Sequence, residues 1–235
     1  MIDQTQGWNA YYRRGRLAYM PELFVVRFFR ALRNRGDFLR EHKVEDWIVP
    51  PLASVLDFGC GNGRHTIFIH QEGWSVTGCD VSADALALLR DAVEDDGTPP
   101  RVDLISGGLP YPSHSFDIVV AHGVFDHIPQ VEREGWTHEV ARVLRPGGLL
   151  YASLIARSTH ERASVESEQV LQDGEEAGLT QTFYTPDTII SEFGDLFRVR
   201  SIAYDNRGLV YPGQSIIEHR FWAFLELKHQ SRPAS

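Results

Sequence analysis

Residues 54–155 alternate between short apolar runs and amphipathic segments, and this alternation limits the possible folds most strongly. The near-continuous apolar runs indicate strands that are covered on both faces. Between them lie helix signals such as Ser82, whose hydroxyl can cap a helix. The expected order is strand 54–58, helix 64–72, strand 74–79, helix 82–94, strand 101–105, strand 116–121, helix 130–144 and strand 149–155. Strands that alternate with helices predict βαβ units, a parallel sheet and right-handed crossovers.

An amphipathic helix is predicted over residues 21–35, before this alternation begins. Its apolar face must be buried, most simply on the main domain. Arg27, Arg30 and Arg33 fall on the opposite side of the helix. They could meet an anionic substrate or a membrane surface, or they could simply be solvated.

The pattern changes again after residue 155. Residues 156–182 are polar and weakly periodic, which predicts an insertion or lid. A helix is expected to start at Thr185, where a capping residue is followed by proline. Strands 197–204 and 219–228 follow without a helix between them, joined by a loop that contains glycine and proline. They predict an antiparallel pair at the sheet edge.

Charge and hydropathy narrow the class of protein. The chain has 235 residues and a net charge of −9, which argues against a general nucleic-acid binder. No apolar run approaches the roughly 20 residues that span a bilayer, and the first residues lack the apolar core of a secretory signal. We therefore expect a cytoplasmic protein without integral membrane association, as a monomer or homodimer. Two cysteines, Cys60 and Cys79, are too few for a disulfide scaffold.

A glycine-rich loop follows the first strand, in the stretch VLDFGCGNGRH (55–65). A dinucleotide-binding loop would read G-x-G-x-x-G, but Arg64 stands where its third glycine should fall. No Gly-Lys-Ser/Thr follows, so a P-loop is excluded. The acid Asp57, just before the first glycine, would repel a pyrophosphate and suits an amine better. A second acid, Asp80, ends the second strand, where a carboxylate can accept hydrogen bonds from ribose hydroxyls.

Together these residues resemble the S-adenosylmethionine site of the class I methyltransferases. The resemblance is carried by Asp57-Phe58-Gly59-Cys60-Gly61-Asn62-Gly63 followed by Asp80, by 109-LPYPSHSFDIVVAHGVFDHI-128, and by 142-RVLRPGGLL-150. It covers residues 50–155 by motif and 185–228 by pattern alone. It implies S-adenosylmethionine as the cofactor and an α/β, Rossmann-like, seven-stranded, mostly parallel sheet with order 3-2-1-4-5-7-6 and strand seven antiparallel.

The same resemblance implies how a single methyltransferase domain, 1–235, is divided. Helices cover both faces of its sheet. We expect a helical N-terminal cover (1–49), a cofactor-binding core (50–155), a lid insertion (156–184), and a C-terminal helix with edge strands (185–235).

The resemblance also implies roles for individual residues. Glycines of the loop let the backbone approach the methionyl part, Asp57 orients its amino group, and Asp80 takes the ribose hydroxyls. Val81 could lie against an adenine face, and the end of the fourth strand lies near the cofactor. The family often places an acid after strand three to reach the adenine amine, whereas this chain has none there, so adenine recognition is assigned to backbone groups or a serine. The expected cofactor-binding set is Tyr12, Asp57, Gly59, Gly61, Asp80, Val81, Ser106, Gly107, Ala121 and His122.

Aromatic residues near the N-terminus complete this expectation. The stretch WNAYYRRG (8–15) resembles the N-terminal segment that closes over the cofactor in many small-molecule methyltransferases. The aromatic side chains could equally pin the first helix to the core.

Methyl transfer is an in-line displacement at a sulfonium, so the enzyme mainly aligns the acceptor in a dry site. A general base helps when the acceptor is a hydroxyl or a carbon acid, whereas positioning can suffice for an amine or thiol. His127, just past the fourth strand, is the best candidate, although its ring could instead hydrogen-bond within its loop. His122 and Asp126 lie nearby, but no recognisable metal-ligand set appears, and we expect no metal.

The predicted function is methyl transfer to the O, N or C atom of a small molecule. Three alternatives stay open: a protein or nucleic-acid methyltransferase, an aminopropyl transferase, and a non-catalytic protein that binds S-adenosylmethionine. The intact glycine loop and Asp80 weigh against the last.

Overall fold

The structure is a computed structural model that describes residues 4–15, 20–50, 52–94, 97–156, 167–172, 174, 176–211 and 214–229, apart from the side chains of 206–218. Its elements, in chain order, are α1 (Gln4–Arg13), α2 (Leu23–Asn34), α3 (Asp37–Glu41), β1 (Ser54–Phe58), α4 (Arg64–Gln71), β2 (Ser75–Asp80), α5 (Ala83–Ala92), β3 (Arg101–Leu104), β4 (Phe116–His122), a 3-10 turn (Phe125–His127), α6 (Gln130–Val143), β5 (Leu144–Ile155), β6 (Glu168–Val170), β7 (Thr180–Thr182), α7 (Pro186–Phe193), β8 (Phe197–Tyr211) and β9 (Gln214–Leu227).

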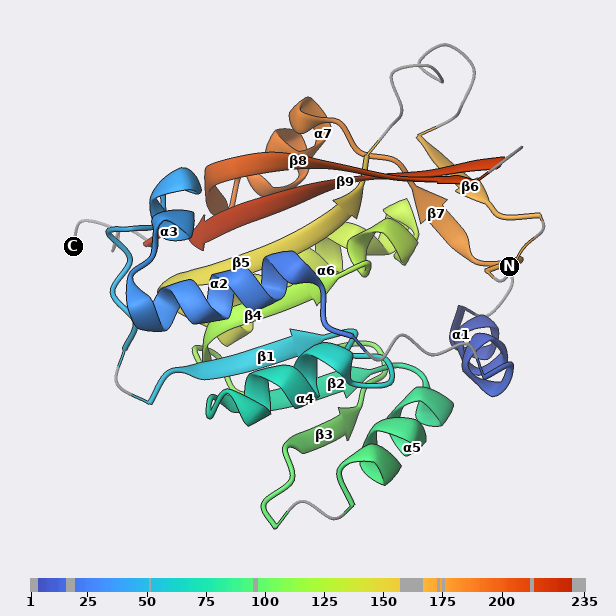
Figure 1. Ribbon diagram of the computed structural model, residues 1–235, viewed down its shortest axis with the longest axis horizontal. Coiled ribbons are helices and arrows are strands. Elements are labelled where there is room, and N and C mark those ends of the chain that lie inside the picture. Colours follow the sequence, from blue (N-terminus) through green and yellow to red (C-terminus); the bar gives the residue numbers. More distant parts are fainter. Residues whose placement is uncertain are drawn as a thin grey trace.

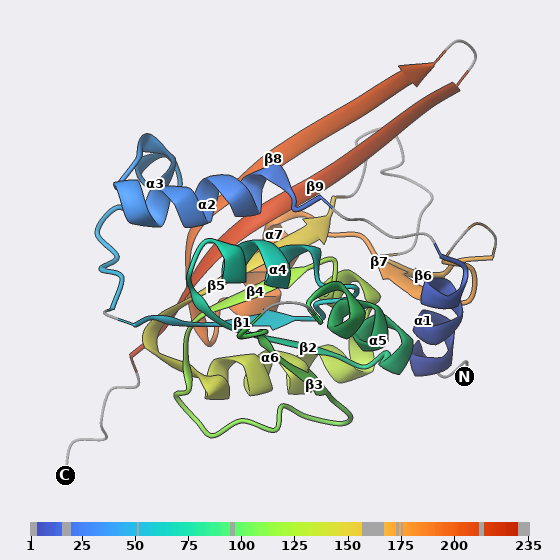
Figure 2. The same cartoon turned by 60° about the horizontal axis from the view of Figure 1, so that its bottom comes forward.

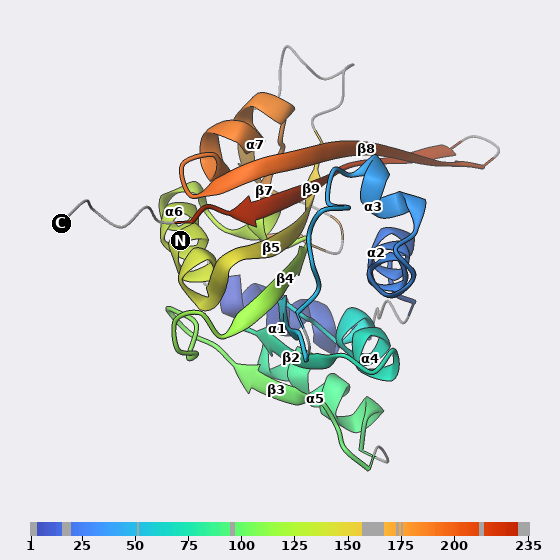
Figure 3. The ribbon, with the colours of Figure 1, turned by 90° about the vertical axis from the view of Figure 1, so that its left-hand side faces the viewer.

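A seven-stranded sheet with the order β3-β2-β1-β4-β5-β9-β8 forms the centre of the molecule (Figure 1). Strands β1 to β5 pair in parallel, and β9 runs antiparallel to both of its neighbours. The predicted strand order and the reversed seventh strand are therefore confirmed, with the small hairpin β6–β7 counted separately. Helices α2 and α4 lie on one face of the sheet and α6 and α7 on the other (Figure 3).

Two helix starts follow the local sequence as predicted. The Ser82 hydroxyl accepts a hydrogen bond from the Ala85 amide at 3.2 Å and caps α5. Thr185 and Thr188 form a reciprocal capping box at the start of α7, with Pro186 in the first turn. These caps satisfy backbone amides that have no partner within their helix.

The last two strands extend further than the sequence prediction. A loop was expected between residues 204 and 219, but the paired register continues out to Tyr211 opposite Gln214. Strand β5 stops pairing with β9 at Arg220, so the two strands continue as a ribbon beyond the sheet, clearly visible in Figure 2. An antiparallel ladder can continue without a third strand because each strand satisfies the backbone groups of the other. The loop prediction was wrong for this reason.

The apolar face of α2 packs on the sheet, as its amphipathic pattern predicts. Val25, Phe28 and Phe29 are fully buried, in a cluster with residues of β1, β4, β5 and β9. The Phe28 ring lies 5.0 Å from that of Tyr151 and 5.3 Å from that of Phe224, measured between centroids. This helix therefore forms part of the main core.

Acidic and aromatic side chains of the same chain face the basic side of α2. Arg27 pairs with Glu41 at 3.4 Å and Arg30 with Glu72 at 3.3 Å. The Arg33 guanidinium lies 5.8 Å from the centroid of the Trp74 ring. Across the described ranges, each helix is too short or too polar to cross a membrane.

The predicted lid insertion, 156–184, is described only in part, because residues 157–166, 173 and 175 lie outside the described residues. The described remainder includes the antiparallel hairpin β6–β7. Strand β7 contacts the 3-10 turn after β4. The hairpin is therefore attached to the loop in which the candidate base lies.

Asp57 occupies a buried position on β1. Its carboxylate accepts a hydrogen bond from the Thr66 hydroxyl of α4 at 2.6 Å. Burial raises the pKa of Asp57 from its ordinary value of 3.8 to about 6, although the bond to Thr66 lowers it. The folded chain therefore binds this proton more tightly than the unfolded chain does.

We expect Phe28→Ala to lower the free energy of unfolding by about 3–5 kcal/mol, because it leaves a cavity between α2 and the sheet. Urea denaturation followed by circular dichroism measures the change. Leu23→Ala, at an exposed position on the same helix, should cost less than about 0.5 kcal/mol. Equal effects of the two substitutions would contradict the docking of α2 through its apolar face.

We expect the stability contribution of Asp57 to fall as the pH rises from about 4 to about 6, by on the order of 2–3 kcal/mol. The sign follows because the folded state holds the proton over this range while the unfolded state has released it. Asp57→Asn removes the titration but keeps an acceptor for Thr66. The free energy of unfolding of the variant, relative to wild type, should rise with pH across this window. A constant difference would refute a raised pKa.

Candidate functional site

The glycine loop after β1 is held in a conformation that favours glycine. Gly59, Gly61 and Gly63 have φ angles of +71°, +55° and +87°. This left-handed region is strained for residues with a Cβ atom. The amides of Gly59 and Cys60 both donate to the carbonyl of Cys79, at 2.8 and 2.9 Å. The loop is thereby fixed against the carboxyl end of β2.

Asp80 stands at that end of β2 and connects the loop to α5. Its Oδ2 accepts from the Gly61 amide and its Oδ1 from the Ser82 amide, each at 2.8 Å. Burial raises the pKa of Asp80, while these backbone hydrogen bonds lower it. Each carboxylate oxygen still has acceptor capacity after these bonds. Because Asp80 lines a cavity, it can accept two further hydrogen bonds from a vicinal diol such as ribose.

Helix α1 covers this end of the sheet. The Asn9 amide oxygen accepts from the Ser82 hydroxyl at 2.7 Å and from the Asp84 amide at 3.3 Å. Arg13 pairs with Asp84 at 3.0 Å. Polar contacts therefore fasten α1 to the start of α5.

Tyr12 of α1 lies directly over the glycine loop. A methyl group on Gly61 would collide with the Tyr12 hydroxyl, so this close approach also requires glycine. Burial and the nearby charge of Asp80 raise the pKa of Tyr12 well above its usual range. The hydroxyl therefore stays protonated and can donate a hydrogen bond.

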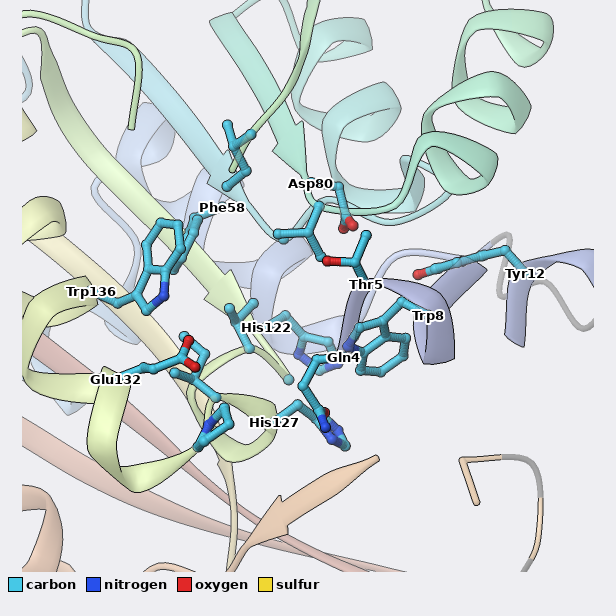
Figure 4. A pocket seen from close by; sticks show the side chains of 17 residues that line it. Gln4, Thr5, Trp8, Tyr12, Phe58, Asp80, His122, His127, Glu132 and Trp136 are labelled. Carbon is cyan, nitrogen blue, oxygen red and sulfur yellow. The ribbon is translucent and has the colours of Figure 1, made fainter. Parts of the chain in front are cut away.

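A cavity lies between the glycine loop, the ends of β2 and β4, helix α6 and the cover α1 (Figure 4). One part of the lining consists of apolar and aromatic groups: Val81, Ile105, Phe58 and Trp136. The part under α1 is lined by Trp8, Gln4, His122 and His127. The first part suits a flat ring joined to a ribose, and the second leaves room for another group beside it.

His127 lines the cavity from the 3-10 turn after β4. Its Nδ1 lies 2.9 Å from the carbonyl oxygen of Thr180 in β7. A carbonyl only accepts, so Nδ1 carries the proton and the neutral ring keeps a lone pair on Nε2. The Trp8 ring meets the imidazole edge to face at 5.0 Å. The alternative was a hydrogen bond from the His127 ring within its own loop. The partner of Nδ1 instead comes from the hairpin β6–β7.

The neighbouring acid, Asp126, has a different role. It is fully buried, and its Oδ2 accepts from Arg220 of β9 at 2.8 Å. The same arginine donates to the Ser153 hydroxyl at 2.6 Å. Among the described residues, no group of three or more His, Cys, Asp or Glu side chains could hold a metal ion.

Several predicted cofactor residues lie outside the cavity lining. Asp57, Gly61 and Ala121 are buried outside that lining, and Ser106 and Gly107 are exposed. Other lining residues were not anticipated: Gln4, Thr5, Phe58, Ile105, Gly123, Val124, Ile128, Pro129, Glu132 and Trp136. Glu132 and Trp136 are four residues apart on α6, which places both side chains on one helix face. This four-residue spacing is the sequence signal that could have identified the two residues as neighbours.

Comparison with known proteins agrees with this geometry. A family described as "Methyltransferase domain" matches residues 55–148. The chain is 37% identical over 133 residues to the methyltransferase GfsG of Streptomyces halstedii, covering 54% of this chain and 47% of that protein. It is 30% identical over 122 residues to a ubiquinone biosynthesis O-methyltransferase of Hydrogenovibrio crunogenus, covering 50% of each. The chain thus spans about half the length of these curated relatives.

A solved structure of a SAM-dependent methyltransferase from Anabaena variabilis has the same fold. Its TM-score is 0.64 at 20% sequence identity, with 97% of this chain and 96% of that chain covered. The glycine loop, Asp80 and the family match all fall within one segment. Residues 55–148 therefore resemble methyltransferase domains in sequence, and the chain shares its fold with a SAM-dependent methyltransferase.

Proposed function

We propose that this chain transfers a methyl group from S-adenosylmethionine to a small-molecule acceptor and releases S-adenosylhomocysteine. The observation that carries the proposal is that one cavity is lined both by Asp80 and by His127, whose Nδ1 lies against the Thr180 carbonyl. Methyl transfer requires the cofactor and the acceptor to lie in the same cavity, because the acceptor atom must approach the methyl group in line with the bond that breaks.

In this proposal, different residues of the site contact different parts of the cofactor. Asp80 accepts from the ribose hydroxyls, and Val81 covers one face of the adenine. The backbone around Gly59 and Gly61 and the Tyr12 hydroxyl face the methionyl part. Asp57 supports the loop through Thr66 and acts on the methionyl amino group through that loop or an intervening water. Ala121 and His122 bring the end of β4 close to the cofactor.

Bound S-adenosylmethionine supplies an electrophilic methyl group on a sulfonium. As the acceptor forms its bond to the methyl carbon, the sulfur–methyl bond breaks and its electron pair stays on sulfur. The Nε2 atom of His127 takes the proton of a hydroxyl or carbon-acid acceptor. The hydrogen bond to Thr180 keeps the ring in the tautomer that can do so. Helix α1 excludes water by covering the cavity.

A small acceptor fits the cover better than a macromolecule does. Trp8 and Gln4 of α1 line the cavity beside His127, so the cover contributes to the walls around the acceptor. The net charge of −9 also opposes binding to nucleic acid. One relative is named for ubiquinone biosynthesis, and its acceptor class supports a small organic molecule here. We further propose a cytoplasmic protein with the division into cover, core, lid and edge strands described above.

We expect Asp80→Ala to weaken binding of S-adenosylhomocysteine by roughly 10- to 100-fold, about 1–3 kcal/mol, because the ribose hydroxyls lose a charged acceptor. Isothermal titration calorimetry measures the change. Asp91→Ala, on the exposed side of α5, makes the same charge change away from the cavity and should bind as wild type does. Equal affinities of all three proteins would remove Asp80 from the cofactor site.

We expect His127→Asn to lower kcat by about 10²- to 10⁴-fold, the usual contribution of a general base. The asparagine amide can keep the bond to the Thr180 carbonyl while the basic nitrogen is lost. Release of S-adenosylhomocysteine in a metabolite extract gives the rate, and calorimetry should show unchanged cofactor binding. His138→Asn, outside this cavity, is the control. An unaltered rate for His127→Asn would leave this histidine with a purely structural role.

A further inference from the structure

The chain lacks an acid at the place from which the adenine amine would be bound. Ser106 and Gly107 follow β3, but both are exposed and lie outside the cavity lining. Only Ile105 of that loop reaches the cavity, and its side chain is apolar. The amine at C6 of adenine donates hydrogen bonds, so an adenine-specific site needs an acceptor from elsewhere.

Two acids near this loop are already committed to other partners. Asp103 of β3 pairs with Arg101 at 2.6 Å and accepts from the Tyr111 hydroxyl at 3.0 Å. Glu139 of α6 accepts from the Leu109 amide at 2.8 Å. Glu139 also pairs with a neighbouring arginine on its helix, which lowers the pKa of Glu139. Both carboxylates hold the loop in place and neither lines the cavity.

Glu132 differs from these acids because it lines the cavity and has no partner group among the described residues. It lies in the first turn of α6, and its side chain points into the cavity beside Trp136 (Figure 4). Glu132 is exposed, and within the described part of the chain its carboxylate has no hydrogen-bond or ion-pair partner from the protein. The Trp136 ring packs against the Phe58 ring with centroids 5.5 Å apart. This contact holds an aromatic surface of the cavity next to Glu132.

The position of the adenine follows from that of the ribose. With the ribose on Asp80, the base extends toward Val81 and Ile105, which follow the ends of β2 and β3. Trp136 and Glu132 line the same cavity from α6. A flat base in this cavity would meet apolar side chains, and Glu132 supplies a carboxylate to the same lining.

We infer that Glu132 reads the adenine amine of the cofactor from α6, in place of an acid after β3. This inference rests on the proposed function and assigns a specificity-determining residue to it. The carboxylate accepts from the amine at C6, whereas it would repel a carbonyl oxygen at the same position. Glu132 therefore discriminates adenine from hypoxanthine.

Calorimetry with S-adenosylhomocysteine and S-inosylhomocysteine, in which a carbonyl replaces the amine, tests the inference on the full chain. Wild type should bind the adenosine compound at least roughly tenfold more tightly, since a hydrogen bond to a charged group is at stake. In Glu132→Gln and Glu132→Ala the ratio of the two affinities should fall below about threefold. Glu134→Gln, on the same helix but outside this cavity, should keep the wild-type ratio.

The ratio separates the possible outcomes. A preference kept by Glu132→Gln and Glu132→Ala, or no preference in wild type, overturns the inference while leaving the proposed function intact. Failure of both compounds to bind wild type at millimolar concentration overturns the proposed function together with the inference. A general loss of folding would weaken both affinities alike and leave the ratio unchanged, so it could not imitate the expected result.

Discussion

The carboxylate of Asp80 is the interaction on which the site depends most. It accepts one amide from the glycine loop and one from the start of α5, so it fixes the relative positions of β1, β2 and α5. Ser82, whose amide it holds, caps α5 and donates to Asn9 of α1. The cover over the cavity is thus fastened to the same point as the cofactor loop. A ligand diol on Asp80 would stabilise an arrangement that already exists.

A second connection links the cover to the acceptor side. The backbone carbonyl of Thr180 accepts from His127, and the backbone amide of Thr180 donates to the Gln4 side chain at 3.2 Å. Helix α1, the hairpin β6–β7 and the 3-10 turn after β4 are therefore joined through one residue. The buried pair of Asp126 and Arg220 anchors that turn to β9 from the other side. These contacts orient a histidine whose neighbours come from distant parts of the sequence.

The sequence predicted the repetitive parts well because periodicity and capping are local properties. Alternating runs located the parallel strands, and Ser82 and Thr185 marked helix starts. The long ribbon of β8 and β9 was missed because cross-strand pairing is not encoded by a local signal. Asp57 and Asp80 were both recognised from the loop motif, yet only the structure separates a buried support from a cavity-lining acceptor. The role proposed for Glu132 could not be predicted from the helix pattern, because it depends on which nearby acids already have partners.

The destination of the methyl group tests the account most directly. The full chain would be incubated with S-adenosylmethionine carrying an isotopically labelled methyl group, in a cell extract that contains metabolites, proteins and nucleic acids. The account predicts that label enters the small-molecule fraction and that one S-adenosylhomocysteine forms for each methyl group transferred. Label confined to protein or nucleic acid would contradict a small-molecule acceptor. Cofactor binding without any transfer would contradict the account at its centre.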